Sequence, residues 1–368
     1  MTRYKVAIIG TGAIAGAHME ALKAMGGRVR VVAAVDADGA RVEAFRAAHG
    51  ITHAYTEVEA MLAAHQPDLV HIATPPRIHA DLTIRCLEAG AWVLCEKPLC
   101  GSLAELDRIE AAERATGKYC SSVAQWRFGS GARRLKDLIR RQELGRLLVG
   151  ICQTTWYRGL AYYQVPWRGT WESELGGTTM GHGIHAMDLF LWLFGDWQVV
   201  SAMVGTLDRP IEVDDVSMAL VRFGNGAFGS IVNSALSPRQ ETYLRFDFQR
   251  ATVELRTLYG YENANWRYSA PEGAAEDAAL TEWRRIPTDV PASHTAQLAA
   301  LLDSMDRDEP PAMCTPEARR TIEFVTSLYK AGATGALVGS GSIGQDDPFY
   351  HHVGGHVPPG SHAPSLGG

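Results

Sequence analysis

The sequence has no long apolar run and no excess of basic residues, and each absence excludes a class of protein. No apolar stretch reaches the roughly 18–20 residues that a transmembrane helix needs. The N-terminus, MTRYKVAIIG, lacks the apolar region and cleavage site of a signal peptide. Acidic residues outnumber basic ones by 41 to 35, for a formal charge of −6, which argues against a nucleic-acid partner. We therefore expect a cytoplasmic protein that binds neither membrane nor nucleic acid.

The cysteines also lack a pattern. None of the six forms a C-x-x-C pair, so their spacing fits neither a disulfide framework nor a thiolate zinc site. We expect them to be buried, unpaired thiols in a reducing compartment. They are Cys86, Cys95, Cys100, Cys120, Cys152 and Cys314.

What the sequence does have is a change of pattern near residue 125, and its length of 368 residues favours two domains. Residues 1–125 alternate short apolar runs, such as KVAIIG and DLVHIAT, with helical patterns. This alternation predicts an α/β Rossmann domain with a doubly wound parallel sheet. Residues 126–338 contain longer strand patterns and a Gly-Asn-Gly hairpin signal, which predict an α+β domain with a large, mostly antiparallel sheet. The composition of residues 339–368 predicts an irregular tail.

A glycine-rich turn follows the first predicted strand. GTGAIA, residues 10–15, has the form G-x-G-x-x-A and opens a helix, whose free N–H groups and dipole attract phosphate. Asp36 ends the second predicted strand, where a carboxylate can accept hydrogen bonds from the ribose hydroxyls of NAD. Because Asp36 would repel a 2′-phosphate and no arginine directly follows it, we expect NAD rather than NADP. The expected cofactor contacts in the turn are Gly10, Gly12, Ala13 and Ile14.

Three further motifs carry a family resemblance. ATPPRIH contains T-P-x-x-x-H, CEKPL contains E-K-P, and GGTTMGHGIHAMD matches a Gly-Gly run that leads to G-x-H-x-x-D. With these motifs the chain resembles the Gfo/Idh/MocA family (glucose–fructose oxidoreductase and inositol dehydrogenase) over essentially its whole length. The resemblance implies a Rossmann domain followed by an α+β domain. It also implies NAD(P)-dependent oxidation of a sugar or cyclitol hydroxyl, or the reverse ketone reduction.

The resemblance assigns roles to particular residues. Lys97 would stabilise the developing alkoxide, and its expected place at the carboxyl edge of the sheet supports this independently. His185 would accept the hydroxyl proton, and the positive end of a helix would keep it neutral. Glu96 would orient Lys97 or contact the cofactor. The other expected cofactor contacts are Thr74, Pro75, His79, Gln125, Trp167 and Arg168. The expected substrate contacts are Lys97, Tyr157, Tyr163, Arg168, His182, His185 and Asp188.

The sequence departs from the family pattern at Gly181, since the family often has an aspartate four residues before the histidine. His182 is the nearest polar residue and could take over the substrate contact or belong to the helix start. Asp188 could orient the ring of His185 or join a structural network. A zinc site at His182 and His185 is the rival interpretation. The tail histidines His351, His352, His356 and His362 could contribute to it, but no cysteine pair or carboxylate cluster completes the shell, so we predict no metal.

Residues 156–174 are rich in aromatic and polar side chains, which favours a carbohydrate ligand. NAD-dependent oxidation of a sugar or cyclitol is the leading hypothesis. One alternative is NAD-dependent cleavage of a glycosidic bond through transient oxidation at C3. Another is a non-enzymatic NAD-binding regulator, against which the presence of both Lys97 and His185 argues. Strand patterns with apolar residues on both faces, SMALVRF and GSIVNSA, predict a homodimer or homotetramer formed through the second domain.

Overall fold

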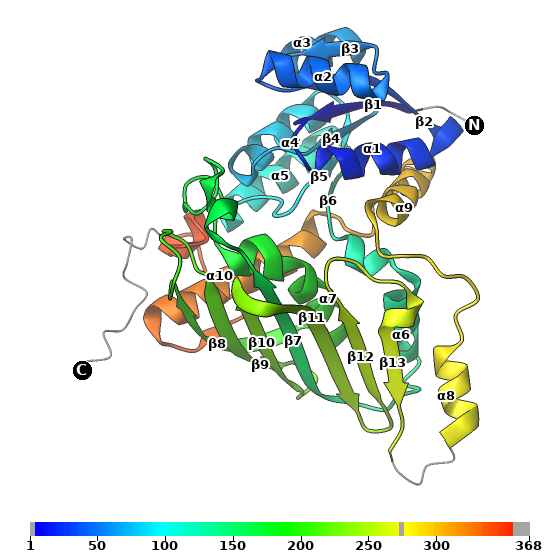
Figure 1. The fold of residues 1–368 in the computed structure, drawn as a ribbon, viewed down its shortest axis with the longest axis vertical. Helices are drawn as coiled ribbons and strands as arrows, with labels where there is room; N and C mark the ends of the chain where they lie inside the picture. Colours follow the sequence, from blue (N-terminus) through cyan, green and yellow to red (C-terminus); the bar gives the residue numbers. More distant parts are fainter. Residues whose placement is uncertain (1–3, 272–275, 356–368) are drawn as a thin grey trace. The chain divides into compact units, whose positions relative to one another are not determined.

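The computed structural model describes residues 4–271 and 276–355 of the chain. It divides into two compact units. The first unit comprises Met1–Val123 and His294–Arg320, and the second comprises Ala124–Ser293 and Thr321–Gly368. A parallel sheet forms the centre of the first unit, and a larger, mostly antiparallel sheet forms the second (Figure 1).

The first unit contains a six-stranded, fully parallel sheet in the order β3-β2-β1-β4-β5-β6. Its strands are β1 (Tyr4–Ile9), β2 (Val29–Val35), β3 (His53–Tyr55), β4 (Leu69–Ile72), β5 (Trp92–Cys95) and β6 (Cys120–Ser122). The helices between them are α1 (Ala15–Ala24), α2 (Gly39–His49), α3 (Val58–His65), α4 (His79–Glu88) and α5 (Leu103–Thr116). Every residue of β4 and β5 is buried, as expected for strands that helices cover on both faces. The predicted Rossmann architecture is confirmed.

Helix α9 (His294–Arg307) follows most of the second unit in sequence but packs in the first unit, beside α1 (Figure 1). Leu298, Leu301 and Leu302 of α9 share a buried cluster with Met19 and Leu22 of α1. The structure therefore divides the chain differently from the predicted boundary at residue 125, because residues 294–320 return to the first unit. An amphipathic pattern indicates that a helix buries one face but not which unit covers it.

The second unit contains an eight-stranded sheet in the order β13-β12-β11-β7-β10-β9-β8-β14, in which only β7 and β10 pair in parallel. Its strands are β7 (Leu147–Tyr157), β8 (Trp197–Gly205), β9 (Val216–Phe223), β10 (Phe228–Ser234), β11 (Leu236–Phe248), β12 (Thr252–Thr257), β13 (Trp266–Ser269) and β14 (Val338–Gly339). Its helices are α6 (Ser130–Arg140), α7 (Ile184–Phe194), α8 (Glu276–Arg284), α10 (Thr315–Thr334), which begins in the first unit, and α11 (Pro348–His351). The predicted α+β architecture is confirmed, and β9 and β10 form the predicted hairpin.

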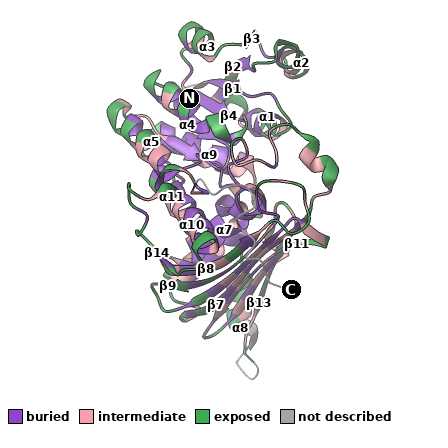
Figure 2. Ribbon diagram, turned by 90° about the vertical axis from the view of Figure 1, so that its left-hand side faces the viewer, coloured by how far each residue is buried: buried purple, intermediate pink, exposed green. Residues whose placement is uncertain are grey.

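One face of this sheet is packed and the other is exposed. Burial alternates along β9 (Figure 2). Phe223 is buried, whereas Met218 and Leu220 are 52% and 65% exposed. Helix α7 covers the packed face, and the ring of its Phe194 lies 4.4 Å from that of Phe223. The buried side chains of β9 thus pack against α7, whereas Met218 and Leu220 lie on the outer face of the sheet.

Part of the segment predicted as an irregular tail is ordered. Residues Val338–Gly339 pair with β8, and Asp347 caps α11 by accepting the backbone N–H of Phe349. Phe349 and Val353 are buried. The prediction is therefore corrected for residues 339–355, because glycine and proline indicate turns but not whether the apolar residues between them pack. His356 and His362 lie outside the described residues.

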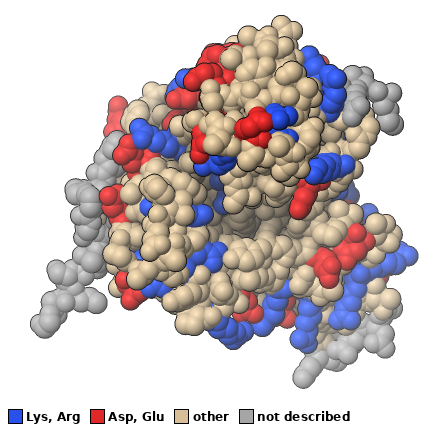
Figure 3. All heavy atoms as spheres, turned by 45° about the horizontal axis from the view of Figure 1, so that its top comes forward, with Lys and Arg blue, Asp and Glu red and all other residues tan. Residues whose placement is uncertain are grey.

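All six cysteines are unpaired, and five of them are buried. Burial raises the pKa of the Cys86 thiol to about 12, which keeps it protonated and unreactive at neutral pH. None of the helices in the described part of the chain combines the length and the apolar character that crossing a bilayer requires. On the face drawn in Figure 3, basic and acidic side chains are interspersed.

Candidate active site

The glycine-rich turn between β1 and α1 leaves room for a phosphate group. Gly10 has a φ of +90°, and a Cβ there would lie 2.5 Å from the carbonyl oxygen of Ala73. Only glycine tolerates both constraints. A Cβ on Gly12 would meet nothing within 4 Å, so the space in front of the turn is open. Helix α1 has no side-chain cap and no acidic residue in its first turn, which leaves its N-terminal amides for an anion.

Asp36, at the carboxyl end of β2, holds the same turn. Its carboxylate accepts the backbone N–H of Thr11 at 2.9 Å and the hydroxyl of Thr11 at 2.8 Å. The guanidinium of Arg41, in the first turn of α2, donates to the other oxygen at 2.7 Å. Burial acts to raise the pKa of Asp36, but the hydrogen bonds from Arg41, Asp38 and Thr11 outweigh it and lower the pKa to about 2. The sequence argument missed Arg41 because it considered only the residues directly after Asp36.

The loop after β4 lies against the glycine turn. A Cβ on Gly10 would be 2.9 Å from the backbone nitrogen of Thr74. The hydroxyl oxygen of Thr74 is buried and has no hydrogen-bond partner among the described residues. Pro75, in extended conformation, follows it. An orphaned hydroxyl beside an open phosphate cradle fits a bound dinucleotide, since buried polar groups are normally paired.

Lys97 follows β5 at the carboxyl edge of the sheet, is partly buried, and precedes Pro98 through a cis peptide bond. The neighbouring His79 is buried. Its Nδ1 lies 2.7 Å from the carbonyl oxygen of Pro98, and its Nε2 lies 2.8 Å from that of Thr74. Burial lowers the pKa of His79, although both carbonyls act in the opposite direction. Because backbone oxygens occupy both ring nitrogens, any cofactor role of His79 is indirect, through the two loops that it joins.

Glu96 lies in a buried group of imidazoles within the first unit. Its Oε1 is 3.2 Å from Nε2 of His18 on α1 and 2.8 Å from Nε2 of His294 on α9. Its Oε2 accepts the backbone N–H of Lys97 at 3.2 Å. Nδ1 of His71, on β4, lies 3.0 Å from Nδ1 of His18. Sequence analysis missed all three histidines, because each stands alone in an apolar element and carries no motif.

The surroundings of Glu96, His18 and His71 shift the pKa of each side chain. Burial acts to raise the pKa of Glu96, but hydrogen bonds from His18 and His294 hold it well below its usual range. Burial lowers the pKa of His18, although Glu96 opposes that shift. Burial also lowers the pKa of His71. An ionised carboxylate therefore lies beside the neutral imidazoles of His18 and His71, directly before Lys97.

In the second unit, His185 occupies the first turn of α7, after a π-helical turn at Thr179–Gly183. Its ring stacks on that of Trp126, with centroids 6.4 Å apart and an angle of 21° between the planes. His182 is buried, and its Nε2 accepts the Nε–H of Arg158 at 3.2 Å and lies 2.9 Å from the hydroxyl of Tyr162. Since arginine only donates, this contact assigns the proton of His182 to Nδ1.

Asp188 lies one turn further along α7. The guanidinium of Arg127 donates to both of its oxygens at 2.7 Å, and the hydroxyl of Thr321 donates to Oδ1 at 2.8 Å. The side chains of Arg127 and Asp188 are 5% and 6% exposed. This is the structural network that the sequence left open as one alternative. A substrate contact of Asp188 would have to break it.

The aromatic loop expected to contact substrate gathers arginines around His182. The guanidinium of Arg168 lies 3.7 Å from the ring centre of Tyr162, and that of Arg158 lies 5.2 Å from the same ring. Nε of Arg168 is buried without a hydrogen-bond partner among the described residues, as is Oε1 of Gln125. Gln125 begins a 3-10 turn, three residues after β6 ends at Ser122.

The remaining residues that were expected to contact cofactor or substrate are Trp167, Tyr157 and Tyr163. Arg168 also covers the ring of Trp167 at 4.5 Å. Tyr157 is 45% exposed at the end of β7. Burial raises the pKa of Tyr163, and nearby carboxylates, that of Glu174 first, add to the shift.

Comparison with known proteins identifies the chain. Residues 4–123 match the model of an oxidoreductase family with an NAD-binding Rossmann fold, and residues 132–256 match the C-terminal domain of the same family. This chain belongs to the Gfo/Idh/MocA family. It is 25% identical over 364 residues to the D-apiose dehydrogenase of Paraburkholderia graminis, covering 94% of this chain and 92% of that protein. The chain is therefore an oxidoreductase.

Two further relatives concern the cofactor. The crystal structure of the WlbA dehydrogenase from Bordetella pertussis, in complex with NADH and UDP-GlcNAcA, matches with a TM-score of 0.82 and 25% identity, over 92% of this chain and 98% of that one. The D-xylose 1-dehydrogenase (NADP(+)) 2 of Haloferax volcanii is 26% identical over 311 residues, covering 82% of this chain and 89% of that protein. Relatives in this family thus bind NADH in one case and are named for NADP in another.

A buried carboxylate lies beside Gly181, where Gfo/Idh/MocA proteins often carry an aspartate. Glu174 is 4% exposed, and its Oε1 lies 3.6 Å from the position that a Cβ on residue 181 would take. Its Oε2 accepts the backbone N–H of Gly169 at 2.6 Å. Sequence analysis missed Glu174 because it lies seven residues before Gly181 in an irregular loop. The spacing in the sequence therefore does not show that the two residues are close in space.

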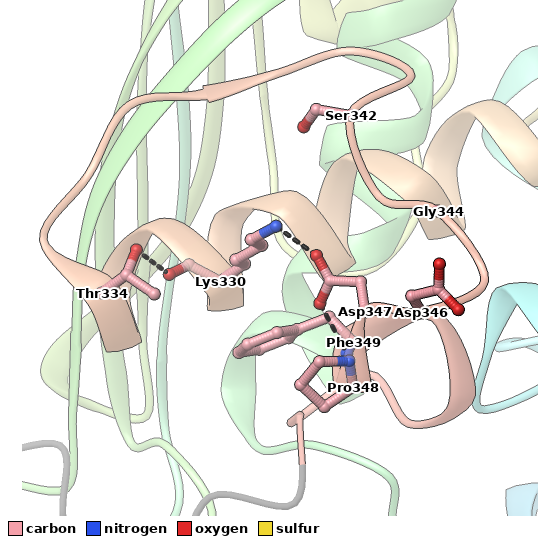
Figure 4. Close-up of a pocket in the computed structure, with 8 residues that line it drawn as sticks. All are labelled: Lys330, Thr334, Ser342, Gly344, Asp346, Asp347, Pro348 and Phe349. Atoms are coloured by element: carbon pink, nitrogen blue, oxygen red, sulfur yellow. Dashed lines mark hydrogen bonds and ion pairs between the residues drawn. The ribbon is translucent and has the colours of Figure 1, made fainter.

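Two other features lie apart from these residues. A recess between α10 and the segment that follows β14 is lined by Thr334, Ser342 and Phe349 among others, and an ion pair of Lys330 with Asp347 crosses it (Figure 4). None of the predicted site residues lines it. Among the described residues, the one group of side chains arranged as metal ligands is His18, Glu96 and His294, which does not include His182 or His185.

Proposed function

We propose that this protein is an NAD-dependent dehydrogenase that oxidises a hydroxyl group of a sugar, sugar derivative or cyclitol, or reduces the ketone in reverse. The observation that carries the proposal is the open glycine turn of α1, with the orphaned hydroxyl of Thr74 beside it and Asp36 at the end of β2. These features, together with family membership, support a dinucleotide site.

The proposed cofactor contacts follow from this geometry. Backbone amides of Gly12, Ala13 and Ile14 would bind the pyrophosphate, while Gly10 lets the turn close on the loop of Thr74 and Pro75. Asp36 would accept the ribose hydroxyls. The free oxygen of Gln125 is suited to an amide donor such as that of nicotinamide. Trp167 and Arg168 remain proposed cofactor contacts, and Glu96 either contacts the cofactor or orients Lys97.

Lys97 and His185 are the proposed catalytic residues. When bound, the nicotinamide supplies the hydride acceptor. Lys97 would donate a hydrogen bond to the reacting oxygen and stabilise the negative charge that develops on it. His185 would accept the hydroxyl proton. The orphaned Nε of Arg168 and the rings of Tyr157 and Tyr163 support a polar ligand with apolar faces, as sugars are. His182 and Asp188 remain proposed substrate contacts, and Asp188 would first have to give up a hydrogen bond to Arg127 or Thr321.

The preference for NAD over NADP rests on Asp36, which would repel a 2′-phosphate. Arg41 acts in the other direction. It pairs with Asp36, its side chain is 53% exposed, and a guanidinium is the type of group that binds that phosphate. We favour NAD because Asp36 already has a lowered pKa and stays ionised.

A panel of sugars and inositols tests the function. We expect at least one of them to reduce NAD, followed through the absorbance of NADH, without cleavage of a glycosidic bond. Release of an aglycone without net NADH would favour the glycosidase alternative, in which transient oxidation at C3 is reversed. NAD binding without turnover of any member would favour the non-enzymatic regulator.

We further propose that the outer face of the large sheet binds a second copy of the chain. Met203 of β8 lies opposite Met218 of β9 in the sheet, and they are 80% and 52% exposed. Leu220 and Phe228 are 65% and 62% exposed on the neighbouring positions. Arg222, directly opposite Phe228, is also exposed, so the face is largely apolar and carries a charge. An exposed, largely apolar face is typical of a subunit interface, and a second copy offers a face of the same chemistry, which supports a homodimer or homotetramer.

A further inference from the structure

We propose that His18, His71, Glu96 and His294 form a clamp that positions Lys97, and that hydrogen bonds rather than a metal ion hold this clamp together. The inference rests on the proposed role of Lys97 in the dehydrogenase. It assigns a function to three histidines outside the family motifs, of which His18 and His71 are buried and His294 is partly buried.

The protons of the clamp can be counted. Ionised Glu96 is an acceptor only, so both His18 and His294 donate Nε2–H to its Oε1. A neutral His18 with its proton on Nε2 has a lone pair on Nδ1, which accepts the Nδ1–H of His71. Nε2 of His71 then carries only a lone pair, and it has no partner among the described residues. Every N–H in the chain from His71 to Glu96 is therefore used.

A divalent metal accounts less well for the same atoms. Two histidines and a glutamate are a common zinc donor set. A metal on Nε2 of His18, however, would require its proton on Nδ1 and would move the proton of His71 onto buried Nε2, where no acceptor is described. The 2.8 Å separation of His294 Nε2 and Glu96 Oε1 is also shorter than the edge of about 3.3 Å that metal–ligand bonds of about 2.0–2.1 Å give a tetrahedral site.

The clamp reaches Lys97 through the second carboxylate oxygen. Oε2 of Glu96 accepts the backbone N–H of Lys97, and His79 holds the carbonyl of Pro98 on the other side. Lys97 is thus fixed from both flanks in a loop that follows the end of β5. His294 contributes from α9, so residues far apart in sequence tie one loop to two helices. If His18 or His294 no longer donates to Glu96, the carboxylate can change its orientation, and its hydrogen bond to the backbone of Lys97 is weakened.

The test compares two substitutions at His294. In His294→Leu the carboxylate loses a donor, whereas in His294→Gln the side-chain amide can still donate to it. We expect His294→Leu to lower kcat by about 10–100-fold, since a misplacement of about 1 Å can cost that much. NAD affinity, measured by fluorescence titration, should change less than about twofold, because the clamp leaves the glycine turn intact. His294→Gln should recover most of the loss. His53→Leu, at an exposed histidine on β3 of the same unit, is the matched control and should retain wild-type kcat.

Hydrogen exchange gives a readout that needs no substrate. The amide of Lys97 should lose protection in His294→Leu and keep it in His294→Gln, at equal thermal stability. Wild-type kcat and protection in both variants would overturn the clamp, while loss of activity in Lys97→Ala would leave the proposed function standing. Full activity of Lys97→Ala would instead refute the proposed role of Lys97. Stoichiometric binding of Zn²⁺ by chelator-treated protein, abolished in His294→Leu, would replace the clamp with a metal site.

Discussion

The ion pair of Arg127 and Asp188 offers a prediction that separates a structural role from a substrate role. Asp188→Asn removes the negative charge but keeps the shape, so the guanidinium of Arg127, 5% exposed, stays buried without its counter-ion. Breaking a buried pair from one side costs about 3–5 kcal/mol. The two donor contacts of 2.7 Å and the added hydroxyl of Thr321 favour the upper half of that range. For a unit of this size about 4 kcal/mol corresponds to a fall in Tm of roughly 10 °C.

The assay is thermal and denaturant unfolding of wild type, Asp188→Asn and the double variant Arg127→Met/Asp188→Leu. The double variant removes both charges and should regain most of the stability, because apolar replacement of a buried pair is often neutral. Glu59→Gln, which breaks the exposed pair of Glu59 and Arg85, should cost no more than about 1 kcal/mol. If Asp188→Asn changed stability by less than about 1 kcal/mol but raised the KM for substrate tenfold, Asp188 would be a substrate ligand and the structural reasoning would be wrong.

Three further predictions concern the cofactor turn and the outer sheet face. Asp36→Ala should reduce the ratio of kcat/KM for NAD over NADP chiefly by weakening NAD, and equal use of both cofactors by the wild type would refute the preference. Because the pKa of Asp36 is lowered to about 2 in the folded state, its ionised form stabilises the protein above the ordinary value near 3.8, and this stability is lost as pH falls from about 4 towards 2. Unfolding free energies measured across that range should fall less steeply in Asp36→Asn. Phe228→Lys, which places a charge on the apolar face, should shift the mass seen by light scattering towards the monomer, and a monomeric wild type at micromolar concentration would count against the interface.

The fold was predictable from the sequence because its signals are local. Alternating strand and helix patterns specify the parallel sheet, and the Gly-Asn-Gly turn specifies a hairpin. The three-residue strand β3 was missed because three residues are too few to show a period. The partner of α9 was missed because its apolar stripe fits any apolar surface.

The site was predictable only where a motif is contiguous. The glycine turn and Lys97 lie in such motifs, whereas Asp36 was predicted from its place at the end of the second strand. All three lie at the carboxyl edge of the parallel sheet. Arg41 reaches Asp36 only because the first turn of α2 brings it back. Glu174 reaches the space beside Gly181 only through the course of an irregular loop. Long-range pairs of this kind follow from tertiary packing and leave no period in the sequence.

The proposed division of labour between Lys97 and His185 gives the most direct test of the chemistry. Oxidation of a hydroxyl requires loss of a proton as well as a hydride. Removing a general base typically costs about 10²–10⁴ in rate, and removing a donor to a developing oxyanion costs about 10²–10³. Lys97→Ala and His185→Ala should therefore each lower kcat at least about a hundredfold by those ranges, with NAD affinity near that of wild type.

The double variant and His182 complete this test. Lys97→Ala/His185→Ala should lose less than the product of the single losses, because residues that act as a unit are not additive. His182→Ala should affect KM more than kcat, since Arg158 already donates to its Nε2 and so opposes protonation there. Near-normal kcat in His185→Ala, combined with an inactive His182→Ala, would identify His182 as the proton acceptor. In that case the Nε–H of Arg158 would have to leave Nε2 of His182 before Nε2 could accept a proton. Arg158→Lys, which removes this Nε donor, would then raise kcat.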